Sequence, residues 1–257
     1  MISIIMITYN RIEMFKKCVA SILETTNDVA REIIIWDNGS DDGTKEFIER
    51  LSEKNNFIIP VFSDRNIGVN AKSRSFEMAK GDYIVGVDDD VLSFPEKWVG
   101  KMIEAFEKSP DLGYLALDVV QNEHTLGAKY PEKEYIEKTI DDNITLQYGP
   151  TGGWCFMIPR YVYEKVGKLR QMKNNIFFGE DGDYSMRCSL KGYKSAILKG
   201  VKCFHATGPY YNKGYERIFD EKMKNWNSSD FDFHKFKYYM IRGIRKIRNI
   251  FKGKIVL

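Results

Sequence analysis

The sequence predicts an α/β protein built on a doubly wound, mostly parallel sheet. Four short apolar runs alternate with segments of helical periodicity within the first 90 residues, and each run ends in polar residues. The carboxyl ends of parallel strands meet at one edge of such a sheet, so these polar residues should converge there. A chain of 257 residues that is 43% hydrophobic can bury this core as one large domain, with or without an appendage.

The first strand is expected over residues 2–7, a nearly continuous apolar run typical of a central strand covered on both faces. A polar turn follows and leads into a helix; its residues are Thr8, Tyr9, Asn10 and Arg11. This turn places hydroxyl groups, an amide and backbone N–H groups at a helix N-terminus, where anions bind readily. Helix capping would explain Asn10 equally well, but it leaves Tyr9 without a role.

The second and third strands also end in polar residues. The run at residues 33–36 ends at Asp37, which is placed to accept hydrogen bonds from a base or a ribose. The run at residues 58–62 is followed by Asn66 and by a helix over residues 70–79. Both polar ends should therefore lie beside the turn that follows the first strand.

The fourth strand, over residues 83–87, ends in three consecutive carboxylates, Asp88, Asp89 and Asp90. Carboxylates are costly to bury, so they should lie at the strand end, where water or a cation can reach them. Mg²⁺ and Mn²⁺ sites commonly use one or two carboxylates together with substrate phosphates. The stretch therefore predicts a metal–diphosphate site, with an acidic turn before the next helix as the alternative.

Several sequence signals that would indicate other functions are missing. No Gly-x-Gly-x-x-Gly follows the first strand and no Gly-Lys-Ser/Thr loop occurs, which disfavours dinucleotide dehydrogenases and P-loop NTPases. No apolar run approaches the ~18 residues of a membrane span, and the N-terminus does not resemble a signal peptide. The four cysteines are scattered without a C-x-x-C spacing, so we expect reduced core thiols and a cytoplasmic location.

Four stretches in this order resemble the family 2 glycosyltransferases: residues 4–11, 36–44, 65–68 and 79–90. The resemblance implies the GT-A fold, inversion at the anomeric centre, a nucleotide-diphosphate sugar as donor, and Mn²⁺ or Mg²⁺ bound at an Asp-x-Asp motif. Where the family often has Arg-Asn before its Ala-x-Gly, this chain has Lys72-Ser73.

The second half of the chain continues the alternation of strands and helices. We expect a helix over residues 98–107, strands over 113–120 and 155–158, and a helix over 161–167. Residues 121–148 are polar, and we expect them to form an excursion that carries part of the acceptor specificity.

Trp154 and His205 are further candidates in this half. Gly152 and Gly153 allow a close backbone approach to a ligand, and Trp154 then offers a flat apolar face of the kind on which sugars stack. The alternative is a tight bend with a tryptophan in the core. His205 follows a strand expected over residues 196–201 and is either a metal ligand or a packed or surface histidine.

The stretch that contains Glu180 and Asp181 is the second chemical centre, and it resembles the Glu-Asp signature of the same family. An inverting transfer needs a carboxylate that takes the proton of the acceptor hydroxyl, and the resemblance assigns that role to Asp181. The alternative is that the acidic residues only favour the positive end of a helix dipole. For Asp183 we favour this alternative, together with an ion pair to Arg187 four residues on.

The resemblance assigns the remaining roles by position. The residues expected to bind the nucleotide sugar are Thr8, Tyr9, Asn10, Arg11, Asp37, Asn66, Lys72, Asp88 and Asp89. The residues expected to contact the acceptor or the donor sugar are Gly153 and Trp154. The residues expected to bind the metal are Asp88, Asp90 and His205. Asp181 is expected to be the general base, and Glu180 to hold the acceptor or orient Asp181.

The C-terminal segment differs in charge from the rest of the chain. Residues 234–257 carry eight of the 39 Lys and Arg and no acid, which leaves 31 basic against 36 acidic residues in the rest. Apolar residues recur every three or four positions over residues 233–251, so we expect a basic amphipathic helix that binds an anionic membrane surface. Packing of its apolar stripe on the core is the alternative, and nucleic-acid binding is disfavoured by the acidic body.

Together these observations predict a GT-A domain over residues 1–207 and a helical appendage over 208–257. The expected function is transfer of a sugar from a nucleotide-diphosphate donor, with UDP slightly favoured, to a glycan or lipid-linked acceptor, at the inner face of a membrane if the appendage binds there. A sugar-phosphate nucleotidyltransferase is the first alternative, but it usually opens with a Gly-rich, basic phosphate loop. An inactive glycan-binding or membrane-scaffold protein is the second, and the two intact acidic motifs argue against it.

Overall fold

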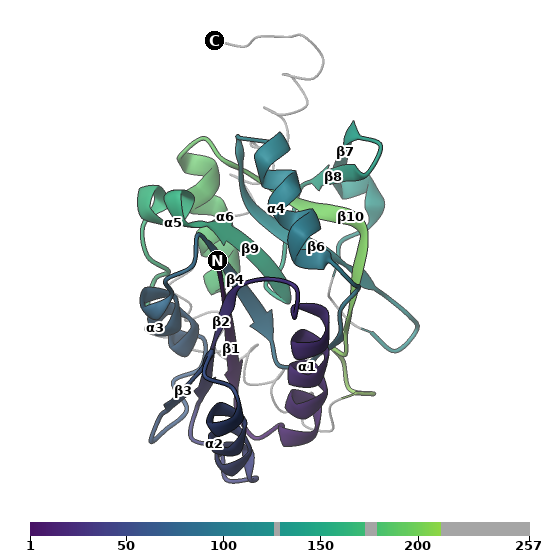
Figure 1. Ribbon diagram of the computed structural model, residues 1–257. Coiled ribbons are helices and arrows are strands. Elements are labelled where there is room, and N and C mark those ends of the chain that lie inside the picture. Colours follow the sequence, from purple (N-terminus) through teal and green to yellow (C-terminus); the bar gives the residue numbers. More distant parts are fainter. Residues whose placement is uncertain (126–128, 173–178, 212–257) are drawn as a thin grey trace.

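The computed structural model describes residues 1–125, 129–172 and 179–211, and within them a ten-stranded sheet forms the centre of the molecule (Figure 1). The strands are β1 (Ile2–Thr8), β2 (Arg31–Asp37), β3 (Ile58–Phe62), β4 (Tyr83–Asp88), β5 (Val91–Ser93), β6 (Leu112–Val120), β7 (Ile136–Asp141), β8 (Ile144–Tyr148), β9 (Cys155–Pro159) and β10 (Lys194–His205). The helices are α1 (Ile12–Thr25), α2 (Thr44–Lys54), α3 (Asn70–Met78), α4 (Trp98–Lys108), α5 (Arg160–Val166) and α6 (Glu180–Leu190). A short 3₁₀ turn, Glu132–Glu134, precedes β7.

The strand order confirms the predicted doubly wound, mostly parallel sheet. The order is β3-β2-β1-β4-β9-β6-β10-β8-β7, and β5 pairs with the end of β10. The pairs β1–β2, β1–β4, β2–β3 and β6–β10 are parallel. β9 lies antiparallel between β4 and β6, so these two neighbours run in the same direction. The carboxyl ends of all the long parallel strands therefore lie at one edge.

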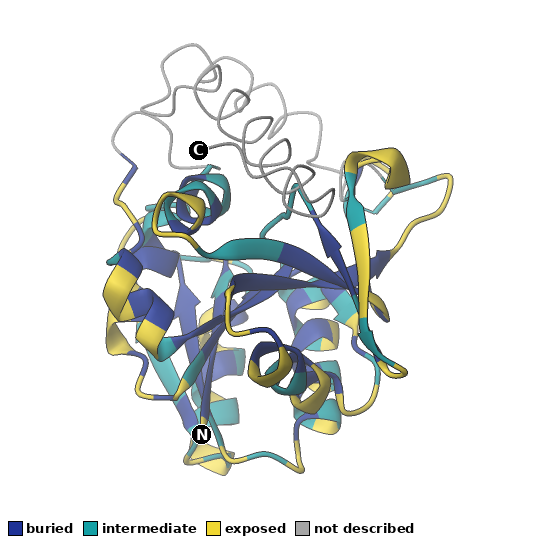
Figure 2. Ribbon diagram, turned by 90° about the horizontal axis from the view of Figure 1, so that it is seen from above, coloured by how far each residue is buried: buried dark blue, intermediate teal, exposed yellow. Residues whose placement is uncertain are grey.

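Helices lie on both faces of the sheet, so its central strands are buried on both sides (Figure 2). The burial pattern of β1 reflects this, because all but one of its residues are buried. Helix α1 buries a stripe at helical spacing against the sheet, formed by Phe15, Cys18, Val19 and Ile22. The exposed residues of α1 include the charged Glu13, Lys17 and Glu24, as expected for a helix that packs by one side only.

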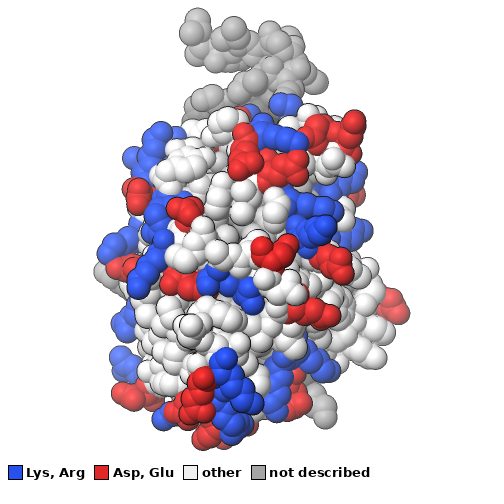
Figure 3. Space-filling model, in the orientation of Figure 1, with Lys and Arg blue, Asp and Glu red and all other residues white. Residues whose placement is uncertain are grey.

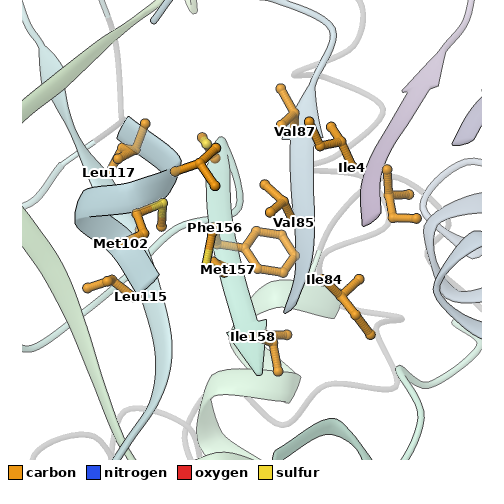
Figure 4. Close-up of a cluster of buried hydrophobic side chains, with 14 of the residues drawn as sticks. Ile4, Ile84, Val85, Val87, Met102, Leu115, Leu117, Phe156, Met157 and Ile158 are labelled. Atoms are coloured by element: carbon orange, nitrogen blue, oxygen red, sulfur yellow. The ribbon is translucent and has the colours of Figure 1, made fainter. Parts of the chain in front are cut away.

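Strand β9 fills the middle of the core between β4 and β6 (Figure 4). The ring of Phe156 stacks on Tyr114 of β6 at a centroid distance of 4.7 Å. On its other side is Gly86 of β4, where an added Cβ would come within 2.5 Å of that ring. The glycine in the otherwise bulky strand β4 is thus required by the aromatic side chain of its neighbour.

The polar stretch at residues 121–148 differs from the simple excursion expected from sequence. Its second part forms the antiparallel hairpin β7–β8, which extends the sheet beyond β10. Glu137 and Lys138 of β7 are exposed, which is how a polar sequence forms an edge strand. The sequence analysis did not predict these two strands, because exposed edge strands lack the apolar run of central strands.

Strand β10 is also longer than the expected residues 196–201. It runs from Lys194 to His205 and keeps its parallel pairing with β6 across a register shift between Leu198 and Lys202. Gly200 sits in this irregular stretch with φ of 81°, and its N–H donates to Asp118 Oδ2. The bulge lets the strand continue, so His205 lies in the strand and not beyond it.

The remaining expectations concern the surface charges, membrane-spanning helices, the cysteines and the C-terminal segment. On the face shown in Figure 3, Lys and Arg side chains are interspersed with Asp and Glu over the surface. In the described part of the chain, no helix combines the length and the apolar character that crossing a membrane requires. The four cysteines are buried and form no disulfide, in agreement with the expected core thiols. The predicted basic helix over residues 233–251 lies outside the described residues.

Candidate active site

The strand register brings the polar strand ends together. Thr8 is paired with Asp37, and Ile7 is paired with Asp88, so the ends of β1, β2 and β4 lie level. The predicted convergence of Thr8, Asp37 and the three aspartates at one sheet edge is therefore what the structure shows. Thr8 is 1% exposed, and its buried Oγ1 makes no hydrogen bond of normal geometry among the described residues, although the hydroxyl lies close enough to Asp89 to favour the ionised form of that carboxyl.

The turns after β1 and β2 are tied to each other. Asn10 adopts a positive φ of 52°, its N–H donates to Ser40 Oγ, and its Oδ1 accepts from Asp41 N. Asp37 accepts hydrogen bonds from the N–H (3.1 Å) and the hydroxyl (2.5 Å) of Ser40. Asn10 therefore bridges the two turns and does not cap α1, which has no side-chain cap.

Two other residues expected at the nucleotide site lie along the same edge. Tyr9 is 41% exposed, so its ring is free to meet a ligand. Asn66 closes its own turn, because its Oδ1 accepts from Gly68 N at 2.8 Å. The side chain of Asn66 thus shapes the backbone at the end of β3 in the structure.

Asp88, Asp90 and His205 form the candidate metal site. One ligand atom from each lies within 4.8 Å of the others. The end of β10 pairs with β5, which sets His205 opposite Val91, and Ala206 N donates to Asp90 O at 2.8 Å. Asp88 ends β4, so three separate elements meet at this cluster.

The cluster fits a hard divalent cation. Asp90 Oδ1 and His205 Nδ1 are buried without a hydrogen bond of normal geometry among the described residues, although His205 Nε2 lies 3.0 Å from Asp90 Oδ1. Buried polar atoms that lack partners destabilise a fold unless a ligand satisfies them. Two carboxylates and an imidazole are also a donor set that Mn²⁺ accepts.

Arg11 contacts the other side of the acidic turn. Its Nη1 lies 2.9 Å from Asp89 Oδ1 and 3.1 Å from Asp90 Oδ2. Asp89 is the largest influence that raises the pKa of Arg11, while burial raises the pKa of Asp89 to about 6. Burial alone would raise the pKa of Asp90 too, but His205 and Arg11 hold it below its usual range. Asp90 is thus kept ionised, as a cation ligand must be.

Asp181 is the second chemical centre at this edge. Helix α6 begins at Glu180 after Gly179, which has φ of 101°. Asp181 lies against the Gly152–Gly153 turn, because a Cβ on Gly153 would meet Asp181 Oδ2 at 3.0 Å. Burial and the neighbouring Glu180 raise the pKa of Asp181 to about 6. A carboxylate with a raised pKa is suited to act as a general base near neutral pH.

Glu180 has a different partner from those expected. Its Oε1 accepts from Lys72 Nζ at 2.8 Å, and both side chains are buried. Lys72 Nζ also lies 3.2 Å from Asp88 Oδ1. Sequence reasoning placed Lys72 at the donor but missed both contacts. One signal was available, since Lys72 lies four residues before the buried Phe76 on α3 and must share its face.

For Trp154 and Asp183 the structure shows which of the two alternatives from the sequence analysis each side chain follows. Trp154 is 3% exposed and donates from Nε1 to Leu117 O at 2.9 Å, so it is a core tryptophan without an open face for stacking. Asp183 forms the predicted ion pair with Arg187, with Nε and Oδ2 2.8 Å apart. Arg170 also contacts Asp183, so this carboxylate anchors α6 to the preceding segment.

The sheet of this chain has the GT-A glycosyltransferase fold, which it shares with solved glycosyltransferase structures. The chain belongs to glycosyl transferase family 2, whose model matches residues 3–167. Uncharacterized glycosyltransferase MJ1057 of Methanocaldococcus jannaschii is 25% identical over 208 residues, which cover 77% of this chain and 68% of that protein.

Two glycosyltransferases are examples of solved structures that share the fold. The mannosyltransferase PcManGT from Pyrobaculum calidifontis, in complex with GDP-Man and Mn²⁺, superimposes with a TM-score of 0.59 and 17% identity. That match covers 80% of this chain and 56% of the mannosyltransferase. GalNAc-T7 with UDP, GalNAc and Mn²⁺ superimposes with a TM-score of 0.64 and 16% identity, over 85% of this chain and 47% of its own. The chain thus spans about half the length of these two structures.

Proposed function

We propose that this chain catalyses metal-dependent, inverting transfer of a sugar from a nucleotide-diphosphate donor to a hydroxyl group of a glycan or lipid-linked acceptor. One observation carries the proposal: the cluster of Asp88, Asp90 and His205 and the carboxylate of Asp181 lie at the same sheet edge, joined through Lys72 and Glu180. Family membership supports the reaction class.

The metal would be held by Asp88, Asp90 and His205. Mn²⁺ or Mg²⁺ at these ligands would stabilise the negative charge of the departing diphosphate. Both structural neighbours were solved with Mn²⁺, which favours that ion. The net charge of the site also favours a bound cation, since its carboxylates outnumber the cations Arg11 and Lys72. The carboxylates are Asp88, Asp89, Asp90, Glu180 and Asp181.

Asp181 would take the proton of the acceptor hydroxyl while that oxygen attacks the anomeric carbon from the face opposite the diphosphate. A single displacement of this kind inverts the anomeric centre. Glu180 is a poor candidate for the base, because it is buried and bound to the Lys72 ammonium. Asp181 is less enclosed than Glu180, and its carboxylate lies against the Gly152–Gly153 turn.

The nucleotide would lie along the ends of β1, β2 and β3. Thr8, Tyr9, Asp37 and Asn66 lie along this part of the edge, and Arg11 contacts both Asp89 and, in the metal cluster, Asp90. One neighbour was solved with GDP-Man and the other with UDP, so proteins of this fold accept guanine as well as uracil nucleotides. UDP remains our slight preference.

The test is thermal stabilisation of the full chain by UDP, GDP, ADP, CDP and dTDP, each with Mn²⁺, with Mg²⁺ and with EDTA. We expect one nucleoside diphosphate to raise Tm only when a metal is present. The corresponding sugar nucleotides are then assayed for slow hydrolysis, with Asp181→Asn as the control. If no diphosphate raises Tm with either metal and no sugar nucleotide is turned over, the proposed function is wrong.

A further inference from the structure

Lys72 is a buried ammonium that joins the two chemical centres of the site. Its side chain is 5% exposed and comes from α3, in the first half of the chain. Nζ contacts Asp88 Oδ1 at 3.2 Å and Glu180 Oε1 at 2.8 Å, and the ring centroid of Phe156 lies 5.6 Å from it. Glu180 is 108 residues away in sequence, so no local structure explains this contact.

Burial of an isolated ammonium is unfavourable unless charged partners compensate for the lost hydration. The two carboxylates that Nζ contacts, Asp88 and Glu180, supply this compensation for the buried ammonium. One of its partners belongs to the metal cluster and the other is the first residue of α6, directly before Asp181.

We propose that Lys72 is a positioning residue for the transfer reaction, which links Asp88 of the metal cluster to Glu180 and thereby fixes the start of α6, and with it Asp181, relative to the donor. This inference rests on the proposed function. It goes beyond the expected role of Lys72 as a donor-binding residue, because the lysine acts here through two carboxylates. A displacement of about 1 Å at a reacting group can lower the rate by ~10²-fold.

The same ammonium sets the charge around Asp181. The charged and titratable groups that act on Asp181 are Glu180 on α6, Lys72 on α3, Asp88 at the end of β4 and, on β6, the hydroxyl of Tyr114. Of these, Lys72 supplies the positive charge, and the Gly182 N–H adds a hydrogen bond to Asp181 Oδ1 at 2.7 Å. Removing the ammonium leaves carboxylates facing carboxylates, so Asp181 would keep its proton to higher pH.

The experiment compares Lys72→Met with Glu180→Gln in the full chain. Lys72→Met removes the positive charge and should raise the pKa of Asp181 by about 1 unit or more. Glu180→Gln removes a negative charge with little change of shape and should lower it. If Lys72 and Glu180 only packed against each other, the two substitutions would not shift the pKa of Asp181 in opposite directions. The pKa is read from the ¹³C carboxyl signal of Asp181 in metal-free protein, assigned by its absence in Asp181→Asn.

The kinetic readout separates positioning from binding. In Lys72→Met, kcat for the sugar nucleotide should fall by on the order of 10²-fold, while the Kd of the nucleoside diphosphate with Mn²⁺ changes much less. Lys72→Arg should recover part of the loss. Arg187→Met is the control, since Arg187 also anchors α6 through Asp183 but is not among the groups that influence Asp181 most strongly. It should lower Tm without moving the pH profile.

The outcomes can be told apart. Unchanged Asp181 titration in folded Lys72→Met and in Glu180→Gln overturns the inference about Lys72, whatever the activity. If Lys72→Met does not fold, the inference is tested by two other results. These are the direction in which the pKa of Asp181 shifts in Glu180→Gln and the partial activity of Lys72→Arg. Absence of turnover in the wild-type chain with every sugar nucleotide defeats the proposed function instead, and the titration still reports whether the bridge governs Asp181.

Discussion

Asp181 and Gly153 lie in such close contact that a single added carbon would separate them: a Cβ on Gly153 would come within 3.0 Å of Asp181 Oδ2 and 3.2 Å of Asp181 Cβ. These contacts are tighter than ordinary van der Waals packing allows. The glycine therefore has a steric reason to be there, and the position of the proposed base depends on it.

Gly153→Ala should therefore lower the transfer rate by ~10- to 10²-fold with little change in donor affinity, because the base is displaced and the donor residues are not. The measurement is kcat for transfer alongside calorimetric donor binding. Gly100→Ala is the matched control, since a Cβ there meets no atom within 4 Å and lies on the exposed side of α4. Equal activity of the two variants would contradict the proposed contact.

Asp181→Asn should abolish most of the transfer activity. The amide keeps the shape but cannot take a proton, and loss of a general base typically lowers the rate ~10²- to 10⁴-fold. Donor binding, followed by calorimetry, should change little. Asp183→Asn should lose stability through its contacts with Arg187 and Arg170, yet keep most of its activity per folded molecule. An inactive Asp183→Asn beside an active Asp181→Asn would reverse the assignment.

The raised pKa of Asp181 predicts how stability changes with pH. The folded protein binds this proton more tightly than the unfolded chain, with a pKa of about 6 against an ordinary 3.8. The stabilising contribution of the protonated carboxyl is complete below pH 3.8 and is lost as pH rises through about 6. Asp181→Asn should therefore be more stable than the wild type above pH 6, by ~1–2 kcal/mol given the partial exposure of Asp181, with no gain near pH 4. Thermal melts across this range check the sign.

Asp90→Asn should weaken metal-dependent binding of the nucleoside diphosphate by at least ~10-fold. The substitution removes a negative charge from an oxygen ligand of the cluster while preserving its size. Removal of metal with EDTA should have the same effect on the wild type and little further effect on the variant. Asp142→Asn serves as the control, because Asp142 is exposed in the turn between β7 and β8. Wild-type affinity in both EDTA and Asp90→Asn would remove the metal from the mechanism.

Truncation after Asp232 tests the basic C-terminal segment, which lies outside the described residues. If that segment binds membranes, the truncated protein should keep its diphosphate binding and lose affinity for anionic liposomes, by up to ~1 kcal/mol per basic residue removed. Neutral liposomes provide the comparison. A truncated protein that is insoluble or melts much earlier would show that the apolar stripe packs on the core.

The sequence predicted the parts of the fold that follow from local pattern. Apolar runs such as residues 83–87 identify central strands, and the polar residues after them identify the edge at which Asp37, Asp88 and Asp90 lie. Strand β5 has only three residues, too few for a period to show. Its pairing with His205, which completes the metal cluster, depends on tertiary structure alone.

The contacts of the site were harder to predict than its members. Arg11 and Lys72 were placed at the donor by resemblance, but their ion pairs with Asp89 and Glu180 depend on how distant elements pack. Trp154 shows the same limit in the other direction, because a tryptophan after two glycines looks alike in sequence whether it lines a site or fills the core. Burial and partner choice are properties of the assembled sheet.

Because of the bulge in β10, the face of the sheet to which His205 points depends on the number of residues that precede it in the strand. Neighbouring residues of a strand point to opposite faces, so inserting or deleting one residue reverses the face of every side chain beyond it. Between Leu198 and Lys202 the strand holds three residues more than β6 does over the paired stretch from Leu117 to Asp118. Deletion of Gly200 alone would thus keep every chemical group of the metal cluster in the chain while turning the imidazole to the wrong side. The odd or even number of residues in a bulge is, at this site, as decisive as the identity of the ligand.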